Sequence, residues 1–223
     1  MSRVLAYCGF LDHEELTVPA SGVNGAAVNV LKRERLGLLW SEVAWPFAQH
    51  ALQKNALEFH GVIEHVFRQT AVVPFRLLSV FDDLAGLEEF AGAHAAGFAA
   101  DLERLGEYVQ MESVVYVIAP RAADTSSGRA YLEQKAEMMR LSAEHATKVK
   151  EAITEVSREI QVREGKNGTR IFALVRRGDE DRFRRAVEAA PLPEGVSRRV
   201  SGPWPAAEFL SQAVKTPQIA GQR

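Results

Sequence analysis

The pattern of apolar and polar positions predicts short strands at the start of the chain. Residues 4–9 form an apolar run that ends at Gly9. Residues 23–30 and 36–43 are β-rich runs, and a charged turn at residues 32–35 separates them. Two such runs on either side of a short polar turn indicate a β-hairpin. We therefore expect a first strand followed by a hairpin.

A helical pattern begins after Pro46. Its apolar stripe consists of Leu52, Leu57, Val62 or Ile63, and Val66. The next apolar run, residues 71–81, contains a proline near its start and predicts a strand. Asp82 or Asp83 is expected to cap a second helix, which continues to Gly106.

The second half of the chain alternates in the order strand, helix, strand, strand, helix, strand. The four strands are expected at residues 112–118, 159–164, 169–175 and 194–202, and a turn-rich connection at 119–128. The first helix is expected at residues 129–154, and the second begins at Asp179 or Glu180 and ends at Pro191. The first of the strands is expected to be buried on both faces. The order of elements is that of a ferredoxin-like α+β unit. The alternative is that the long helix continues past Val156 to Glu164, in place of the third element.

One face of the long helix carries side chains three and four positions apart. They are Leu132, Lys135, Met139, Ser142, Ala146, Val149 and Ile153. This spacing fits a coiled-coil seam with two polar members. A helix that lies on a sheet is the interpretation we prefer, because the seam is short and imperfect.

The predicted fold class is α+β with two domains. We expect an N-terminal α+β domain at residues 1–108 and a C-terminal α+β domain at residues 109–215, and the boundary falls within residues 107–111. Residues 216–223 are expected to be a disordered tail.

Composition excludes several classes of protein. The 223-residue chain has a formal net charge of -2 and a pI near 6.3, so neither nucleic acid nor an anionic membrane is an expected partner. The single cysteine, Cys8, rules out an internal disulfide, suits a reducing compartment, and is expected to be buried. We find no signal peptide and no run long enough to cross a bilayer. We therefore expect a cytoplasmic protein.

The six histidines do not form a recognisable metal or acid–base site. His60 and His65 are five positions apart, so they do not form the i, i+4 pair that chelates zinc. Glu64 can share a helix face with His60, but no third ligand lies at a telling spacing. Residues 126–128 lack the surrounding sequence of a serine-hydrolase elbow. We therefore expect no cofactor, no metal and no enzymatic activity.

Residues 201–210, here called the Trp204 segment, hold an indole between two prolines. A proline pushes the residue before it into an extended conformation, so Gly202 and Trp204 are expected to be extended. Trp204 carries a large apolar area and one N–H that needs a partner. The segment is then either a latch that packs onto the chain's own core or a contact site for another protein, and both roles are compatible.

Three sequence motifs stand out along the chain. The first is Gly202-Pro203-Trp204-Pro205 followed by Phe209-Leu210. The second is Gly128-Arg129-Ala130-Tyr131-Leu132 at the start of the long helix, and the third is Val73-Pro74-Phe75-Arg76 followed by Ser79-Val80-Phe81. These motifs resemble those of the gas vesicle protein F/L family and occur in the family's order, with Ala206-Ala207 where the family usually has Pro-Tyr. Residues around His60, Leu5 and Glu112 also fit the family, so the ordered set covers nearly the whole chain.

This resemblance implies a non-enzymatic protein of gas vesicles, the gas-filled protein compartments that make some prokaryotes buoyant. Its expected role is that of an accessory or minor structural protein in vesicle assembly. The expected partners are the small hydrophobic shell protein and other accessory proteins, and the expected location is the gas vesicle or the cytoplasm. The implied fold has two α+β domains, of which the first is a modified ferredoxin-like unit.

Roles for single residues are expectations at this point. Arg76 is expected to pair with a carboxylate, and Tyr131 to pack at the start of its helix. Trp204 and Phe209 are expected either to fix the end of the chain or to contact the partner.

Three other functions are alternatives. A ferredoxin-like unit can act as a regulatory module that binds a small molecule. An enzyme could use His60, Glu64 and Arg76 in a cleft. A nucleic-acid binder on the sheet is disfavoured by the acidic balance.

Overall fold

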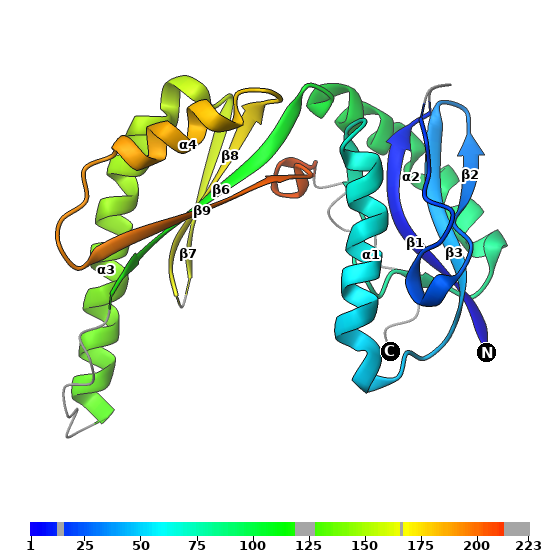
Figure 1. The fold of residues 1–223 in the computed structure, drawn as a ribbon, viewed down its shortest axis with the longest axis horizontal. Helices are drawn as coiled ribbons and strands as arrows, with labels where there is room; N and C mark the ends of the chain where they lie inside the picture. Colours follow the sequence, from blue (N-terminus) through cyan, green and yellow to red (C-terminus); the bar gives the residue numbers. More distant parts are fainter. Residues whose placement is uncertain (13–15, 119–127, 166, 212–223) are drawn as a thin grey trace. The chain divides into compact units, whose positions relative to one another are not determined.

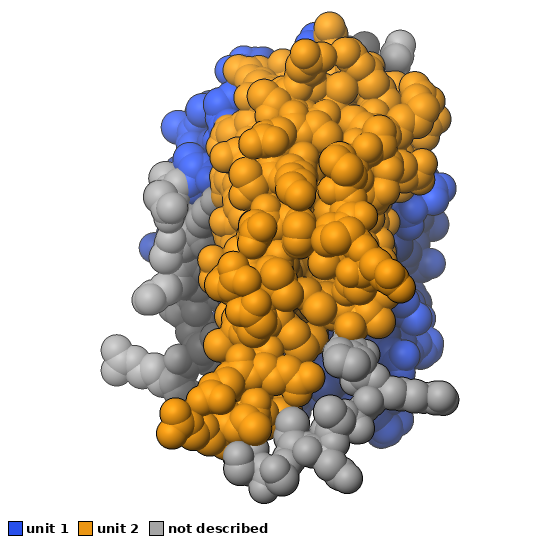
Figure 2. Space-filling view, turned by 90° about the vertical axis from the view of Figure 1, so that its left-hand side faces the viewer, with its two compact units in different colours: residues 1–107, 205–223 blue, residues 108–204 orange. Residues whose placement is uncertain are grey.

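The computed structural model describes residues 1–12, 16–118, 128–165 and 167–211 (Figure 1). The chain divides into two compact units, which Figure 2 colours separately. Unit 1 consists of Met1–Glu107 and Pro205–Arg223, and unit 2 of Tyr108–Trp204. The predicted connection at 119–127 and the predicted tail at 216–223 lie outside the described residues.

Unit 1 is a sheet of antiparallel strands with two helices. Its elements are β1 (Ser2–Leu11), β2 (Asn29–Arg33), β3 (Leu36–Ala44), α1 (Leu52–Phe67), β4 (Val72–Pro74), β5 (Val80–Phe81) and α2 (Leu84–Leu105). The strand order is β2-β3-β1-β4, and β5 also pairs with β1. Strand β1 is central and buried over residues 4–10, which makes it the middle of the core. The Asp83 carboxylate caps α2 by accepting the Gly86 N–H at 2.9 Å, as the sequence predicted.

The predicted hairpin is confirmed, but its first strand begins later than expected. Strand β2 starts at Asn29, and Val23–Gly25 form a single 3₁₀ turn, η1. The buried Tyr7 hydroxyl explains the difference, because it accepts the Val23 N–H at 3.1 Å and so draws the chain away from the sheet. The same hydroxyl donates to Ser41 Oγ at 3.0 Å, and burial raises the pKa of Tyr7.

The predicted apolar stripe of α1 was half wrong. Leu57 is 68% exposed, and Leu52 is exposed as well. The buried stripe continues from Val62 back to Phe59 and Asn55, which are three and seven positions earlier. Leu57 is five positions before Val62, so it points to another side of a helix with 3.6 residues per turn. Helical spacing therefore selected the right element but the wrong face at its N-terminal end.

The single strand expected at residues 71–81 is two short strands. Strands β4 and β5 both pair with β1, and a turn at residues 75–79 separates them. In that turn the Ser79 N–H donates to the Arg76 carbonyl at 2.9 Å, and the Arg76 N–H donates to Ser79 Oγ at 3.2 Å. These local bonds close the turn, while at its two ends the Phe75 N–H donates to the Tyr7 carbonyl and the Ser79 carbonyl accepts the Ala6 N–H of β1.

Unit 2 has the order of elements that the sequence predicted. They are β6 (Tyr108–Val117), α3 (Gly128–Ile153), β7 (Glu159–Gly165), β8 (Gly168–Arg176), α4 (Glu180–Ala189) and β9 (Val196–Trp204). The sheet is antiparallel with the order β7-β8-β6-β9. The alternative of a longer helix is wrong, because α3 ends at Ile153 and residues 159–165 pair with β8 throughout.

The core of unit 2 lies between the sheet and the helices α3 and α4 (Figure 1). Met111 and Val115 of β6 pack there with Phe183 and Val187 of α4. Strand β6 is buried on both faces only over residues 109–113. The C-terminal half of α3 covers the sheet through Ala146, Val149, Ile153 and their neighbours, which is the arrangement preferred from the sequence.

Candidate functional site

The Trp204 segment begins in a β-bulge at the end of β9. Gln110 of β6 pairs with Trp204, and Glu112 pairs with Ser201, so two residues of β9 stand opposite one residue of β6. A bulge of this kind bends the strand and redirects the side chains that follow it. The Gly-Pro pair of the motif therefore sets the direction in which the chain leaves β9.

Gly202 occupies a backbone position that only glycine adopts easily. Gly202 and Trp204 both lie in strand β9, in line with the expected extended conformation, but the φ of Gly202 is +113°, in the left-handed range. A Cβ at Gly202 would lie 2.9 Å from the Gln110 carbonyl oxygen and 3.0 Å from Met111 Sδ. The Gly202–Pro203 peptide bond is cis, and the Gly202 carbonyl accepts a hydrogen bond from Arg184 of α4. The bulge thus depends on a residue without a side chain.

Trp204 and Phe209 have different surroundings. The Trp204 side chain is 37% exposed, and its indole N–H donates to Ser201 Oγ at 3.3 Å. Phe209 is 4% exposed and lies in the short 3₁₀ turn η4 (Ala207–Phe209), flanked by buried Ala206 and Leu210. The buried part of the segment is therefore the part that follows the second proline.

Two side chains of α2 hold the backbone that follows Trp204. The Asp101 carboxylate accepts the Ser211 N–H at 2.7 Å, and Arg104 donates to the Phe209 carbonyl at 2.5 Å. Arg104 also pairs with Asp101 at 2.8 Å, and Asp101 is 3% exposed. Each charged group is satisfied by another, which removes most of the cost of burying them.

Sequence reasoning did not identify Asp101 and Arg104. The available signal was that Asp101 lies three positions after Phe98 and one before Leu102, on the apolar face of α2. A carboxylate on a buried helix face requires a partner. The sequence does not say where along the chain that partner lies.

The position of the Trp204 segment also differs from the expected division of the chain. Residues 109–215 were expected to form one domain that includes the segment. In the structure the residues from Pro205 onward group with unit 1. The reason is the buried contact of Phe209 and its neighbours, together with their hydrogen bonds to α2.

Within the described residues, the ion pair expected for Arg76 is not observed. Arg76 is exposed in the turn between β4 and β5, and no carboxylate pairs with it among the described residues. Glu64 pairs with Arg68 at 2.6 Å instead, and His60 lies on the exposed side of α1. Nor does any group of three or more metal-ligating side chains come together within the described ranges.

The start of α3 presents apolar side chains at the surface. Tyr131 is 54% exposed and Leu132 is 64% exposed, so the expected packing of Tyr131 is not observed. Gly128 is the first residue of α3, and a Cβ there would meet no other atom within 4 Å. These motif residues therefore do not contribute to the core of unit 2.

A groove lies next to this surface, between α3, the end of β6 and the start of β8. It has a volume of about 280 Å³, and we call it the α3 groove. Its lining includes Tyr116, Val117, Lys135, Met138, Met139 and Ser142. Ser142 of the lining also forms a hydrogen bond with Thr169 of β8 at 3.0 Å.

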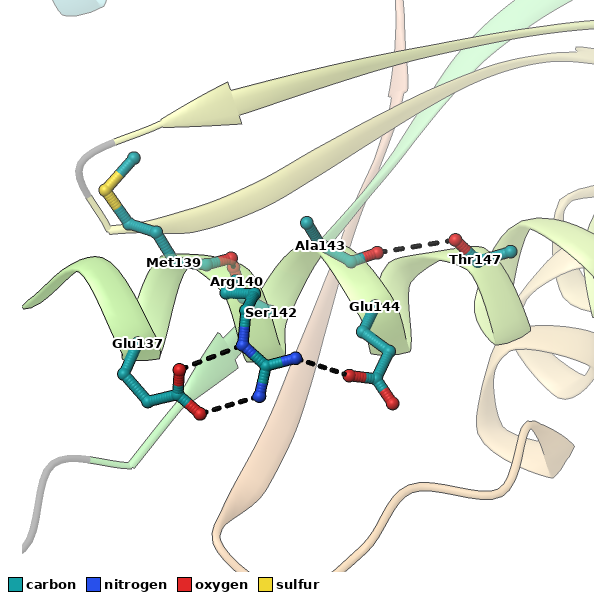
Figure 3. A network of polar contacts seen from close by, with 7 residues as sticks. All are labelled: Glu137, Met139, Arg140, Ser142, Ala143, Glu144 and Thr147. Carbon is teal, nitrogen blue, oxygen red and sulfur yellow. Dashed lines mark hydrogen bonds and ion pairs between the residues drawn. The ribbon is translucent and has the colours of Figure 1, made fainter.

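Charged side chains along this part of α3 pair with each other. Arg140 binds Glu137 at 2.7 Å and Glu144 at 3.3 Å, and Arg129 binds Glu133 at 2.8 Å. The hydrogen bond from Arg140 lowers the pKa of the Glu137 carboxyl. In Figure 3 Met139 points toward the β7–β8 hairpin, whereas the Arg140 cluster extends in another direction.

Taken together, the two antiparallel sheets and their helices define an α+β protein of two units. In the parts of the chain that are described, no helix has both the length and the apolar character needed to cross a bilayer. The sequence model of the gas vesicle synthesis protein GvpL/GvpF family matches residues 3–211. The chain belongs to this family, and membership implies a role in gas vesicle formation.

Solved structures of the family have the same fold. The crystal structure of the gas vesicle protein GvpF from Anabaena sp. PCC7120 is similar with a TM-score of 0.76 and 12% identity, over 95% of this chain and 97% of that chain. GvpF from Microcystis aeruginosa is similar with a TM-score of 0.69 and 12% identity, over 94% of this chain and 99% of that chain. No curated protein matches the sequence.

Proposed function

We propose that this chain is an accessory or minor structural protein of gas vesicle assembly, and that it binds the small hydrophobic shell protein. The observation that carries the proposal is the family match over residues 3–211, which includes the Trp204 segment. The proposed partners are the shell protein and other gas vesicle accessory proteins, with no role for nucleic acid or a membrane. The proposed location is the gas vesicle and the surrounding cytoplasm, and the proposed role involves no catalysis.

The physical basis is the need to cover apolar surface before assembly. A shell subunit with a water-repelling face aggregates unless another surface covers that face. The chain has exposed apolar side chains, among them Tyr131 and Leu132 on α3, that can make such a contact. A contact of this kind keeps the subunit available for addition to the growing wall.

The topology supports a finer statement about the fold. The order β6-α3-β7-β8-α4-β9 with the sheet order β7-β8-β6-β9 is consistent with a ferredoxin-like unit. We infer that unit 2 is of this type and that unit 1 is a modified version. The proposed domain boundary remains at residues 107–111.

The burial of the Trp204 segment suggests separate roles for its two aromatic residues. Phe209 is buried, and its carbonyl is bonded to Arg104, which supports a latch. Trp204 remains partly exposed at the end of β9, which supports a contact with a partner. Arg76, in its exposed turn, is a further position available to a partner.

Co-expression with the major shell protein tests the proposed function. The full chain carries an affinity tag, and the shell protein retained after washing is measured per mole of chain. We expect stable retention and, in cells that carry the remaining vesicle genes, loss of flotation when this chain is omitted. Absence of any association at low salt and high concentration contradicts the proposal.

A further inference from the structure

One side of α3 near its start combines apolar side chains with a lysine that has no ion-pair partner among the described residues. Leu132, Lys135, Met139 and Ser142 are spaced by three and four positions, so they lie along one side of α3. Three of the four line the α3 groove, and Leu132 continues the same line beyond it. The α3 wall of the groove is therefore formed by the N-terminal members of the row of side chains, three and four positions apart, that was noted in the sequence.

Charge distinguishes Lys135 from the other ionic groups of this helix region. Arg129, Glu133, Glu137, Arg140 and Glu144 all take part in ion pairs within α3. Lys135 is the only charged residue in the described lining of the groove, and it has no ion-pair partner among the described residues. Within the described part of the chain, the groove therefore presents one positive charge without an ion-pair partner, next to apolar side chains.

The size and composition of the α3 groove favour a polypeptide over a small molecule. Its volume of about 280 Å³ lies at the lower limit of cavities that enclose small ligands. Exposed Tyr131 and Leu132 extend the apolar surface beyond it. Two of the four methionines in the chain, Met138 and Met139, line the groove, and methionine adapts its shape to apolar partners. Tyrosine and methionine are also enriched at protein interfaces.

We propose that the α3 groove binds an apolar segment of the shell protein that carries a carboxylate. The apolar side chains of that segment contact Leu132 and Met139, and its carboxylate pairs with Lys135. This inference rests on the proposed function and deepens it, because it assigns the surface and the charge that recognise the partner.

The experiment compares matched variants of the full chain in co-expression with the shell protein. Leu132→Asp places a charge in the row of side chains that continues the wall of the α3 groove. Leu57→Asp is its control, because Leu57 is a similarly exposed leucine on a helix of unit 1. Lys135→Glu reverses the groove charge, and Lys148→Glu is its control on an exposed position of the same α3. We expect each groove variant to retain at least about fivefold less shell protein than its control, the effect of losing one interface contact.

Two further measurements make the result specific. A photoreactive residue at position 132 is expected to crosslink to the shell protein, whereas one at position 57 is not. Retention by the unaltered chain is expected to weaken with added salt, and the Lys135→Glu variant loses this dependence. Circular dichroism and thermal melts of all four variants check that they fold alike.

The outcomes separate the inference from the function on which it rests. If the unaltered chain retains the shell protein and both groove variants retain as much as their controls, the groove inference is wrong and the proposed function stands. Crosslinks from position 132 only to this chain's own residues also overturn the inference. If the unaltered chain retains no shell protein, both proposals fail.

Discussion

The Asp101 carboxylate accepts the backbone N–H of Ser211 at 2.7 Å, although the two residues are 110 positions apart in the sequence. Arg104 completes the contact by donating to the Phe209 carbonyl while it pairs with Asp101. One turn of α2 therefore holds the chain at the point where it has returned from unit 2. This contact fixes the backbone on both sides of the buried Leu210, and it can be tested directly.

Asp101→Ala should loosen the attachment of the Trp204 segment. The change removes the acceptor of a backbone N–H and leaves Arg104 without its carboxylate, so we expect a loss of about 2 kcal/mol in the free energy of unfolding. Glu103→Ala is the control, because Glu103 makes an exposed ion pair with Arg35 and should cost less than about 1 kcal/mol. Urea denaturation measures both free energies of unfolding. Equal losses for the two variants would contradict the stabilising role of the contact between Asp101 and Ser211.

Phe209→Ala should destabilise the protein more than Trp204→Ala. Removal of a buried phenylalanine side chain costs about 3–5 kcal/mol. Trp204 is 37% exposed, so less of its apolar area is buried and its removal should cost less than that of Phe209. Thermal melts compare the two, and the shell-protein retention assay is run in parallel. A Trp204→Ala variant that is strongly destabilised but retains the shell protein would assign the latch to Trp204 instead.

Gly202→Ala and Gly61→Ala should have effects of opposite sign. A side chain at Gly202 meets a positive φ and two close atoms of β6, so we expect a loss of at least about 1–2 kcal/mol. Gly61 lies inside α1, and a Cβ there would meet nothing within 4 Å, so alanine should stabilise by about 0.5–1 kcal/mol. Denaturation curves decide the signs, and a neutral Gly202→Ala would refute the proposed need for glycine in the bulge.

Stability should fall at high pH because of Cys8. Burial raises the pKa of the Cys8 thiol above its usual range, so the folded state keeps the thiol protonated. The unfolded chain releases this proton above about pH 8.5. The stability that the neutral thiol maintains is therefore complete below that pH and decreases by about 1.4 kcal/mol per pH unit above it.

A Cys8→Ala variant isolates this effect from the titration of other groups. Denaturation at about pH 7.5, 8.5 and 9.5, which spans the usual thiol pKa, should give a steeper decline for the unaltered chain than for the variant. The native thiol should also resist alkylating reagents until the protein unfolds, because Cys8 is buried in the central strand β1. Parallel declines for the two proteins would contradict the assignment.

The parts of the fold that the sequence predicts well are those with strong local signals. The N-cap of α2 follows from Asp83, and the β7–β8 hairpin follows from the alternating pattern and the glycines that flank its turn. The order of elements in unit 2 needs only such signals. Local patterns fail where a residue distant in sequence determines the backbone conformation. An example is the Tyr7 hydroxyl, which accepts the Val23 N–H and holds that residue away from the sheet.

The candidate site was less predictable for the same reason. The motif containing Trp204 is visible in the sequence, but its anchor on Asp101 and Arg104 depends on residues about half the chain away. The exposure of Leu132 could not be predicted from the sequence, because the three- and four-residue spacing along α3 also fits a helix face that is buried throughout. The pattern of spacing continues along most of α3, but only the C-terminal half of this helix face is buried against the sheet.

The return of the chain to α2 has a consequence for biosynthesis. Folding domains commonly form in order as they leave the ribosome, the N-terminal one first. Here the aromatic ring of Phe209 and the N–H that Asp101 accepts come from residues made after all of unit 2. Nascent chains halted before residue 209 should therefore carry an unfinished first unit, and translation must pass this point before that unit reaches its final stability.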